Sequence, residues 1–165
     1  MTRNETPNGP GLFSLTQIRH LMRTEFERAK RYEYPLACVL LELDGLGTYR
    51  DRQGFDAKEA LLDDLVVLLR HETRTCDYLG RLIDDRMLLV LPHTGTTGAN
   101  VLARRLQDLA GRLSREAGGE AFVVRLSIGA SYFLDGKPVF FDVLLEAAEA
   151  ALEAAAGGKF VEAGR

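Results

Sequence analysis

Residues 74–92 read RTCDYLGRLIDDRMLLVLP, and this stretch decides the fold. Two apolar runs, residues 78–82 and 87–91, flank a polar segment at residues 83–86. Short apolar runs joined by a few polar residues predict two antiparallel strands with a tight turn, a β-hairpin. A turn held by a rigid hairpin can present carboxylates to a ligand, so Asp84 and Asp85 are candidate functional residues.

Apolar periodicity outside the hairpin predicts further helices and strands. We expect helices at residues 15–32, 56–71, 98–116 and 141–156, and strands at residues 36–43, 121–132 and 160–161. Two capping boxes, Ser14 with Gln17 and Asp56 with Glu59, mark the first two helix starts, and residues 45–54 form a polar connection. Placed in one mixed sheet with helices packed on it, these elements give an α+β, ferredoxin-like arrangement.

Composition and charge limit the classes of protein to which the chain can belong. With 165 residues, of which 46% are apolar, we expect a flexible leader at residues 1–11 and a single domain at residues 12–165. The net charge of −3 and the pI of about 5.7 predict no general attraction to nucleic acid or anionic membrane. No apolar run approaches the ~20 residues that span a bilayer, and no signal peptide is recognisable, so we expect a cytoplasmic protein.

Cysteine and histidine residues show no metal-binding or redox spacing. Cys38 and Cys76 lie in separate strand-like stretches, and we expect both to be buried as small hydrophobic residues rather than joined in a disulfide. His20, His71 and His93 are isolated from one another, so we expect them at the surface.

The hairpin resembles the signature hairpin of GGDEF domains, the diguanylate cyclases. In that family a strand ending in Arg-Leu or Arg-Tyr precedes Gly-Gly-Asp/Glu-Glu-Phe and a second apolar strand that ends in Pro. The five signature positions are here Ile83, Asp84, Asp85, Arg86 and Met87. The frame agrees, but the glycines and the signature Glu are absent, so the resemblance implies a degenerate GGDEF-like domain.

Further similarities to the family extend over about residues 11–161. Residues 40–46 correspond to the family's strand ending Asp-x-Asp-x-Phe-Lys, and Gly54 and Phe55 correspond to its Gly-His pair. Residues 127–130 correspond to its Ser-Ile-Gly-Val strand, and residues 148–152 correspond to its Ala-Asp-x-Ala-Leu helix. The fold that the resemblance implies agrees with the α+β arrangement predicted from periodicity.

The resemblance implies that the catalytic centre is damaged. The family's metal positions correspond to Glu42 and Asp85, which are still acidic, so a vestigial magnesium site stays open although no cofactor is required. The acid implicated in catalysis corresponds to Arg86, which reverses the charge. Ile83 and Asp84 replace the glycines and would obstruct and repel a triphosphate. Alternatively, Asp84 and Asp85 form a solvated turn, which we prefer to a metal site.

Substrate-reading positions are altered as well. The family's guanine-reading Asn and Asp correspond to Arg50 and Glu59, and its phosphate-contacting Lys corresponds to Ala156, with Lys159 as a displaced substitute. The resemblance therefore implies a domain without catalytic activity.

A second family site, which binds the product cyclic di-GMP, is retained in the sequence. Its Arg-x-x-Asp motif corresponds to Arg74 and Asp77, five residues before the signature, and a further Arg corresponds to Arg105. A guanidinium can pair with the O6 and N7 edge of guanine, and a carboxylate can accept from its N1 and N2 hydrogens. Structural explanations stay open: a cation favoured beyond a helix C-terminus, a polar residue at a strand start, and an Arg at the core edge with its head in solvent.

These residues lead to one preferred hypothesis and two alternatives. We prefer a catalytically inactive cyclic di-GMP receptor that acts through an unknown partner protein. The alternatives are a nucleotide-independent interaction or dimerisation module, which could form a homodimer, and a metal-dependent nucleotide cyclase that uses Glu42 and Asp85. Neither nucleic acid nor a membrane is an expected partner.

Overall fold

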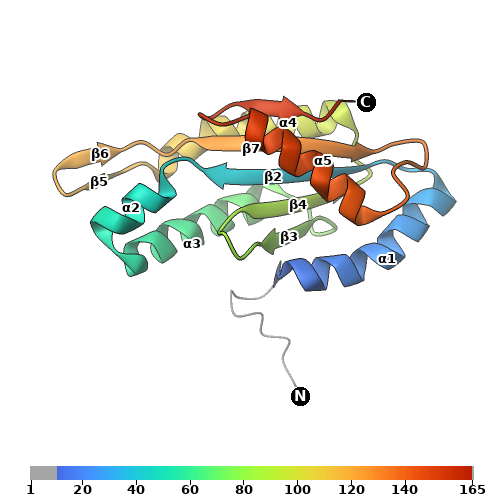
Figure 1. Cartoon of the computed structure of the whole chain (residues 1–165), viewed down its shortest axis with the longest axis horizontal. Helices are drawn as coiled ribbons and strands as arrows, with labels where there is room; N and C mark the ends of the chain where they lie inside the picture. The colour runs from blue at the N-terminus through green and yellow to red at the C-terminus, as the bar shows by residue number, and fades with distance from the viewer. Residues whose placement is uncertain (1–10, 165) are drawn as a thin grey trace, which may run out of the picture.

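The continuous apolar run in residues 36–43 becomes the middle of a six-stranded mixed sheet (Figure 1). The structure, a computed structural model, describes residues 11–164. The strands in spatial order are β1 (Leu12–Phe13), β3 (Tyr78–Arg81), β4 (Met87–Pro92), β2 (Leu36–Leu43), β7 (Leu126–Phe133) and β8 (Phe160–Glu162). β2 pairs antiparallel with β4 and β7, β3 pairs antiparallel with β4, and the outer pairs β1–β3 and β7–β8 are parallel.

Helices cover both faces of the sheet, which gives the predicted α+β architecture (Figure 1). They are α1 (Leu15–Tyr32), α2 (Leu46–Gln53), α3 (Phe55–Glu72), α4 (Thr96–Ala110) and α5 (Phe141–Ala154). The apolar residues of α3 and α4 share one core cluster and those of α1 and α5 share another. None of the helices within residues 11–164 combines the length and apolarity needed to cross a bilayer.

Alternation along the central strands explains why the sheet needs cover on both faces. Val39 and Leu41 of β2 belong to the α3–α4 cluster, whereas Cys38 and Leu40 belong to the α1–α5 cluster. Successive side chains of a strand point to opposite faces. A strand with apolar side chains on both faces, as in residues 36–41, is therefore stable only between two layers of helices.

Three predicted element boundaries are wrong. Residues 45–54 contain α2, whose only buried residue is Tyr49, so its sequence has little amphipathic pattern. The helix predicted to reach residue 116 ends at Ala110, and a short 3₁₀ turn, η1 (Gly111–Leu113), follows. The strand predicted at residues 121–132 is divided: β6 (Glu120–Phe122) pairs with β5 (Arg115–Ala117) in a separate hairpin, and β7 follows.

One of the two predicted capping boxes is present. Ser14 and Gln17 exchange hydrogen bonds between side chain and backbone at the start of α1, as predicted. The box at Asp56 and Glu59 is wrong, because α3 begins after Gly54 without a side-chain cap. Glu59 is therefore available for a different contact.

Of the isolated residues singled out in the sequence, most lie where they were expected. Cys38 is buried, and the three histidines are exposed. The prediction for Cys76 is wrong: this residue is exposed, because β3 begins two residues later and Cys76 lies in the preceding turn. The predicted leader, residues 1–11, lies outside the described residues except for Gly11.

Gly129 should be essential for the packing of α5 on β7. A Cβ at this position would lie 2.6 Å from the Ala148 carbonyl oxygen and would also clash with the Leu152 backbone nitrogen. We expect Gly129→Ala to lower the free energy of unfolding by about 1–3 kcal/mol, because neither backbone atom can move independently. Gly111→Ala is the control, since nothing lies within 4 Å of its Cβ position. Equal urea midpoints for the two variants would contradict this account.

Candidate functional site

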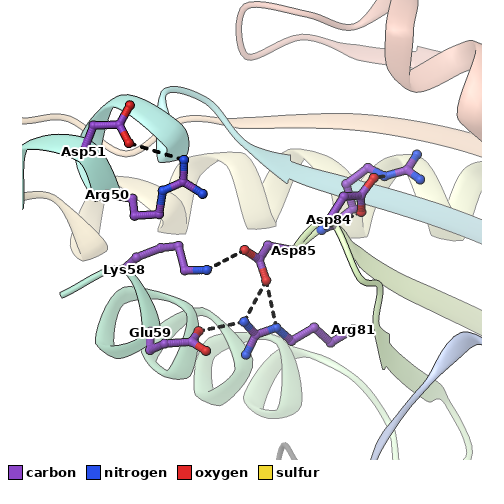
Figure 2. A network of polar contacts seen from close by, with 8 residues as sticks. Arg50, Asp51, Lys58, Glu59, Arg81, Asp84 and Asp85 are labelled. Atoms are coloured by element: carbon purple, nitrogen blue, oxygen red, sulfur yellow. Dashed lines mark hydrogen bonds and ion pairs between the residues drawn. The ribbon is translucent and has the colours of Figure 1, made fainter. Parts of the chain in front are cut away.

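The turn between β3 and β4 holds Asp85 in an unusual backbone conformation. The last pair of the ladder is Arg81 with Met87, and Leu82 and Arg86 close the turn with a 2.9 Å backbone hydrogen bond. Asp85 has a φ of 68°, in the left-handed region that Asp tolerates better than most residues. The turn thereby directs the Asp85 carboxylate toward α3 (Figure 2).

Two cations from different elements share that carboxylate. Lys58 Nζ of α3 donates to Oδ2 at 2.8 Å, while Arg81 of β3 donates to Oδ1 from Nη2 at 2.7 Å and from Nε at 3.2 Å. Arg81 Nη2 also donates to Glu59 Oε2 at 2.6 Å. We call these four residues the hairpin–α3 network; Figure 2 shows Lys58 and Arg81 approaching Asp85 from different directions.

Burial and charge set the ionisation of the hairpin–α3 network. The side chains of Lys58, Arg81 and Asp85 are 9%, 12% and 18% exposed. Burial acts to raise the pKa of Asp85, but the hydrogen bonds and charges of Lys58 and Arg81 outweigh it and lower that pKa below its ordinary value. Burial acts to lower the pKa of Arg81, yet its two carboxylate partners raise it. Asp85 and Arg81 are therefore ionised at neutral pH.

The proposed metal positions face one cavity. Glu42, at the end of β2, and Asp85 both line an open cavity of about 450 Å³, together with the loop that leads into α2. Within residues 11–164, no three His, Cys, Asp or Glu side chains are grouped so that they could hold a metal ion. Asp85 accepts three hydrogen bonds from cations, so a metal ion could use only the remaining lone pair of Oδ2, next to the positive charge of Lys58, unless it displaced Lys58 or Arg81.

The other signature positions lie around the turn. Arg86 donates from Nε to Asp84 Oδ2 at 2.6 Å, and Asp84 is 55% exposed. Ile83 is fully exposed, whereas Met87 is buried in the core. The interpretation of the two acids as a solvated turn is therefore correct for Asp84 and wrong for Asp85.

Arg50 and Glu59, which the resemblance aligns with guanine-reading residues, already have partners within the chain. Arg50 Nη2 contacts Asp51 Oδ1 at 3.3 Å, with both side chains more than half exposed. Glu59 accepts from Arg81 and is 31% exposed. The displaced Lys159 is exposed, precedes β8 and does not line the cavity.

Lys58 is a site residue that no sequence motif marked. It is only 7% exposed, and its ammonium also lies 4.8 Å from the centre of the Phe55 ring. The available signal was its spacing, because Lys58 precedes the buried Leu61 and Leu62 by three and four residues on the helix face turned to the core. A lysine on such a face requires an anionic partner.

Arg74 and Asp77 are brought together by a turn that follows α3. Asp77 accepts from the Arg74 backbone nitrogen at 2.8 Å and from the guanidinium at 3.0 Å through Nη2 and 3.4 Å through Nε. The Asp77 side chain is 4% exposed, but that of Arg74 is 51% exposed. The hydrogen bond with Asp77 raises the pKa of Arg74, so the guanidinium remains charged.

The turn also spans the open end of the hairpin. Arg74 Nη2 donates to the Pro92 carbonyl at 2.6 Å and to Thr94 Oγ1 at 2.8 Å, which connects the start of β3 to the end of β4. Arg105 of α4 pairs with Glu72 at 2.7 Å and is 47% exposed. Arg74 is thus held by Asp77, whereas Arg105 is held by a residue at the end of α3.

Comparison with known proteins places these features in context. A sequence model of the family described as "Diguanylate cyclase, GGDEF domain" matches residues 11–159. A diguanylate cyclase of Vibrio cholerae is 30% identical over 101 residues, 58% of this chain and 32% of that protein. Diguanylate cyclase DosC of Escherichia coli K12 is 26% identical over 149 residues, 86% of this chain and 32% of that protein. The chain spans about a third of the length of these curated relatives.

Solved structures share the fold. Diguanylate cyclase SiaD of Pseudomonas aeruginosa, in complex with its activator SiaC, superposes with a TM-score of 0.84 at 27% identity over 96% of this chain and 61% of that one. The GGDEF domain of DgcB from Caulobacter crescentus, in complex with cyclic di-GMP, gives 0.85 at 13% identity over 100% and 98% of the two chains, which shows the fold alone.

The hairpin–α3 network should make stability depend on acid pH. We expect Asp85→Asn to lower the free energy of unfolding near neutral pH by about 1–3 kcal/mol, because Lys58 and Arg81 lose their shared anion. The folded-state pKa of Asp85 lies below the ordinary 3.8, so its stabilisation is complete above that value and is lost as the pH falls through the folded-state pKa. Urea denaturation of both proteins should therefore converge in strong acid.

Asp84→Asn is the matched control, because it changes the neighbouring exposed acid. We expect it to change the free energy of unfolding by less than about 1 kcal/mol. A difference between wild type and Asp85→Asn that persists unchanged in strong acid would contradict the assigned network.

Proposed function

We propose that this chain, which belongs to the diguanylate cyclase GGDEF-domain family, is a catalytically silent member that binds cyclic di-GMP and passes the signal to a partner protein. The main observation in favour of catalytic inactivity is that Asp85, at a metal position of the family, is already paired with two cations. Its oxygens accept from Lys58 and Arg81, at 2.8 Å and 2.7 Å.

Lys58 supplies internally the positive charge that a metal ion would bring. Magnesium requires near-octahedral oxygen coordination, usually with carboxylates, phosphates and waters. Here one Asp85 oxygen faces an ammonium and the other faces a guanidinium, so a metal ion must either bind beside the positive charge of Lys58 or separate a partly buried ion pair. Separating such pairs is costly, because the remaining charges stay desolvated. The other acids that line the cavity, Glu42, Asp44 and Asp84, form no group of three within residues 11–164 that could hold a metal ion.

The surroundings of Asp85 support the same conclusion. Arg86 stands at the family's catalytic acid position and pairs with Asp84. Ile83 and Asp84 replace the two glycines, so side chains occupy the turn where the backbone would approach a triphosphate. Arg81 engages Glu59, which would otherwise be available to a guanine base.

The receptor part of the proposal rests on the geometry of Arg74. Its half-exposed guanidinium is oriented by the buried Asp77 and by the end of β4. An oriented arginine fork can recognise guanine bidentately. Because Asp77 and Arg74 satisfy each other in the free protein, the ligand must exchange part of this pair for its own contacts. The guanidinium is half exposed, so solvent screens its side of the pair and the exchange costs less than the separation of a fully buried pair.

Arg105 can contribute in the same way. It is half exposed and its partner, Glu72, lies two residues before Arg74 in the chain. Both arginines are therefore anchored around the end of α3. A ligand with two guanine bases and two phosphates offers acceptors to more than one such cation.

One observation favours the alternative of a nucleotide-independent interaction module. Val139, Phe140 and Val143, at the start of α5, are 66%, 70% and 49% exposed. Clustered exposed apolar side chains often mark a protein-binding surface. Partner binding that survives in the Arg74→Ala, Asp77→Ala double variant would favour this function over the receptor.

The proposed absence of catalytic activity can be tested directly. We expect wild type with GTP and magnesium or manganese to form no cyclic di-GMP, as measured by chromatography of the reaction mixture.

Lys58→Ala should increase manganese binding, measured by the water-proton relaxation rate, because it uncovers one Asp85 oxygen. Lys159→Ala, an exposed lysine outside the cavity, is the control. GTP turnover by wild type that disappears in Asp85→Asn would establish the enzyme instead.

Cyclic di-GMP binding is tested by titration calorimetry. We expect wild type to bind, and Arg74→Ala to weaken binding by about 5- to 150-fold, the value of one bidentate guanine contact. Arg105→Ala should weaken binding less, because it removes a single cation rather than the bidentate contact with guanine. Arg104→Ala is the matched control, since this exposed neighbour pairs with Asn100. Absence of heat with wild type at high micromolar ligand would refute the receptor function.

A further inference from the structure

A groove between α1 and the start of α5 is lined mainly by apolar side chains. It has a volume of about 660 Å³, and we call it the α1–α5 groove. None of its lining residues belongs to the cavity beside Asp85 or to the turn that carries Arg74 and Asp77, so it is separate from both sites described above. Its apolar lining residues are Met22, Phe26, Phe133, Val139, Phe140 and Phe141.

One wall of the α1–α5 groove leaves large apolar side chains in solvent. Val139 is 66% exposed, and Phe140, which directly precedes α5, is 70% exposed. Phe26 and Phe141 also line the groove, but they are held in the core and their rings meet edge to face with centroids 6.1 Å apart. A protruding ring beside a hollow with fixed aromatic walls is a shape that another protein surface can cover, and burial of that ring is favourable.

The opposite wall, formed by α1, carries charges of alternating sign. Arg23, Glu27 and Lys30 line the groove and are spaced four and three residues apart, so they lie on one face of the helix. All three are exposed, and among residues 11–164 their side chains have no ion-pair or hydrogen-bond partner. The other two charged residues of the groove, Arg19 and Asp142, pair with each other at 2.9 Å.

These alternating signs restrict what can cover the α1–α5 groove. An acidic segment would be repelled by Glu27, and a basic segment would be repelled by Arg23 and Lys30. A second copy of α1 that runs in the opposite direction presents its charges in reverse order. Arg23 can then face Glu27 of the second copy while Glu27 faces Arg23 of the second copy. A twofold interface repeats every contact in this reciprocal way.

We infer that the α1–α5 groove is an interface between two copies of this chain. The two α1 helices pack antiparallel, Arg23 and Glu27 form reciprocal ion pairs, and Phe140 of each copy covers the groove of the other. This inference goes beyond the proposed receptor function, because it concerns a different surface and requires no cyclic di-GMP. It assigns one set of contacts to the exposed residues 139 and 140 and to the unpaired charges of α1.

Charge reversal tests the antiparallel arrangement by sedimentation equilibrium of the full chain without nucleotide. We expect the apparent mass of wild type to rise from 18.3 kDa toward twice that value as the protein concentration increases. Arg23→Glu and Glu27→Arg should each weaken dimerisation at least about tenfold, because each places like charges opposite one another at two symmetric contacts. An equimolar mixture of the two variants should regain dimers, because every acid of the first variant then faces a base of the second.

The exposed ring gives a second variant, and α4 supplies the controls. Phe140→Ser should also weaken dimerisation at least about tenfold, and urea denaturation checks that the fold is unchanged. Arg104→Glu and Asp108→Arg are exposed, lie outside the groove and match the charge reversals in spacing and in change of net charge. Val101→Ser, which is 56% exposed on the same helix, is the control for the ring.

The outcomes separate this inference from the receptor function. Dimers that the groove variants weaken, that the mixture restores and that the α4 variants leave unchanged support it. A wild type that keeps the monomer mass at every concentration overturns it, and so does a dimer that the groove variants leave unchanged. A dimer that Phe140→Ser weakens but that mixing the two charge variants does not restore overturns the antiparallel arrangement. None of these outcomes affects the receptor function, which is tested by the binding of cyclic di-GMP.

Discussion

The architecture of the candidate site depends on one carboxylate shared by two cations. Asp85 joins Lys58 of α3 to Arg81 of β3, and Arg81 continues the chain of contacts to Glu59. Each of the two cations is at most 12% exposed on its side chain, so neither can be left without an anion. The turn must therefore keep Asp85 in its left-handed conformation, and the first turns of α3 must stay against the hairpin. An internal contact thus holds the hairpin turn against the first turns of α3.

The hairpin connects the hairpin–α3 network with the candidate site around Arg74. Its turn, residues 82–86, carries the hairpin–α3 network, and its other end carries Arg74, which contacts both the start of β3 and the end of β4. A short two-stranded ladder in the middle of a buried sheet is stiff, because its strands are paired on both sides. A change at one end of the hairpin consequently leaves the geometry at the other end intact. In the proposed function, this separation is what allows a domain without catalytic activity to keep a recognition surface.

Contacts that are local in sequence could be predicted, whereas contacts made by tertiary packing could not. The hairpin and the central strand follow from spacing of a few residues. The resemblance assigns Arg74 and Asp77 to a ligand, and the structure adds that they contact each other. Lys58 and Asp85 are 27 residues apart, and only the docking of α3 against the hairpin brings them together. Helix α2 escaped prediction because a helix with one buried residue has almost no apolar period. The sequence likewise marks His93 only as an isolated histidine, since Tyr34, the ring on which it stacks, lies in a distant loop.

The contrast between Asp77 and Arg74 explains how the same contact can be structural and still available for recognition. Asp77 is nearly inaccessible and accepts from the backbone as well as from the guanidinium, so it remains in place whether or not Arg74 moves. Arg74 is half exposed, and acceptors along one edge of its guanidinium fix its orientation. Its solvent-facing surface therefore has less conformational entropy to lose on binding than a free side chain would have. Structural explanations for this pair and ligand binding are therefore compatible: the contacts that stabilise the turn also pre-organise the arginine.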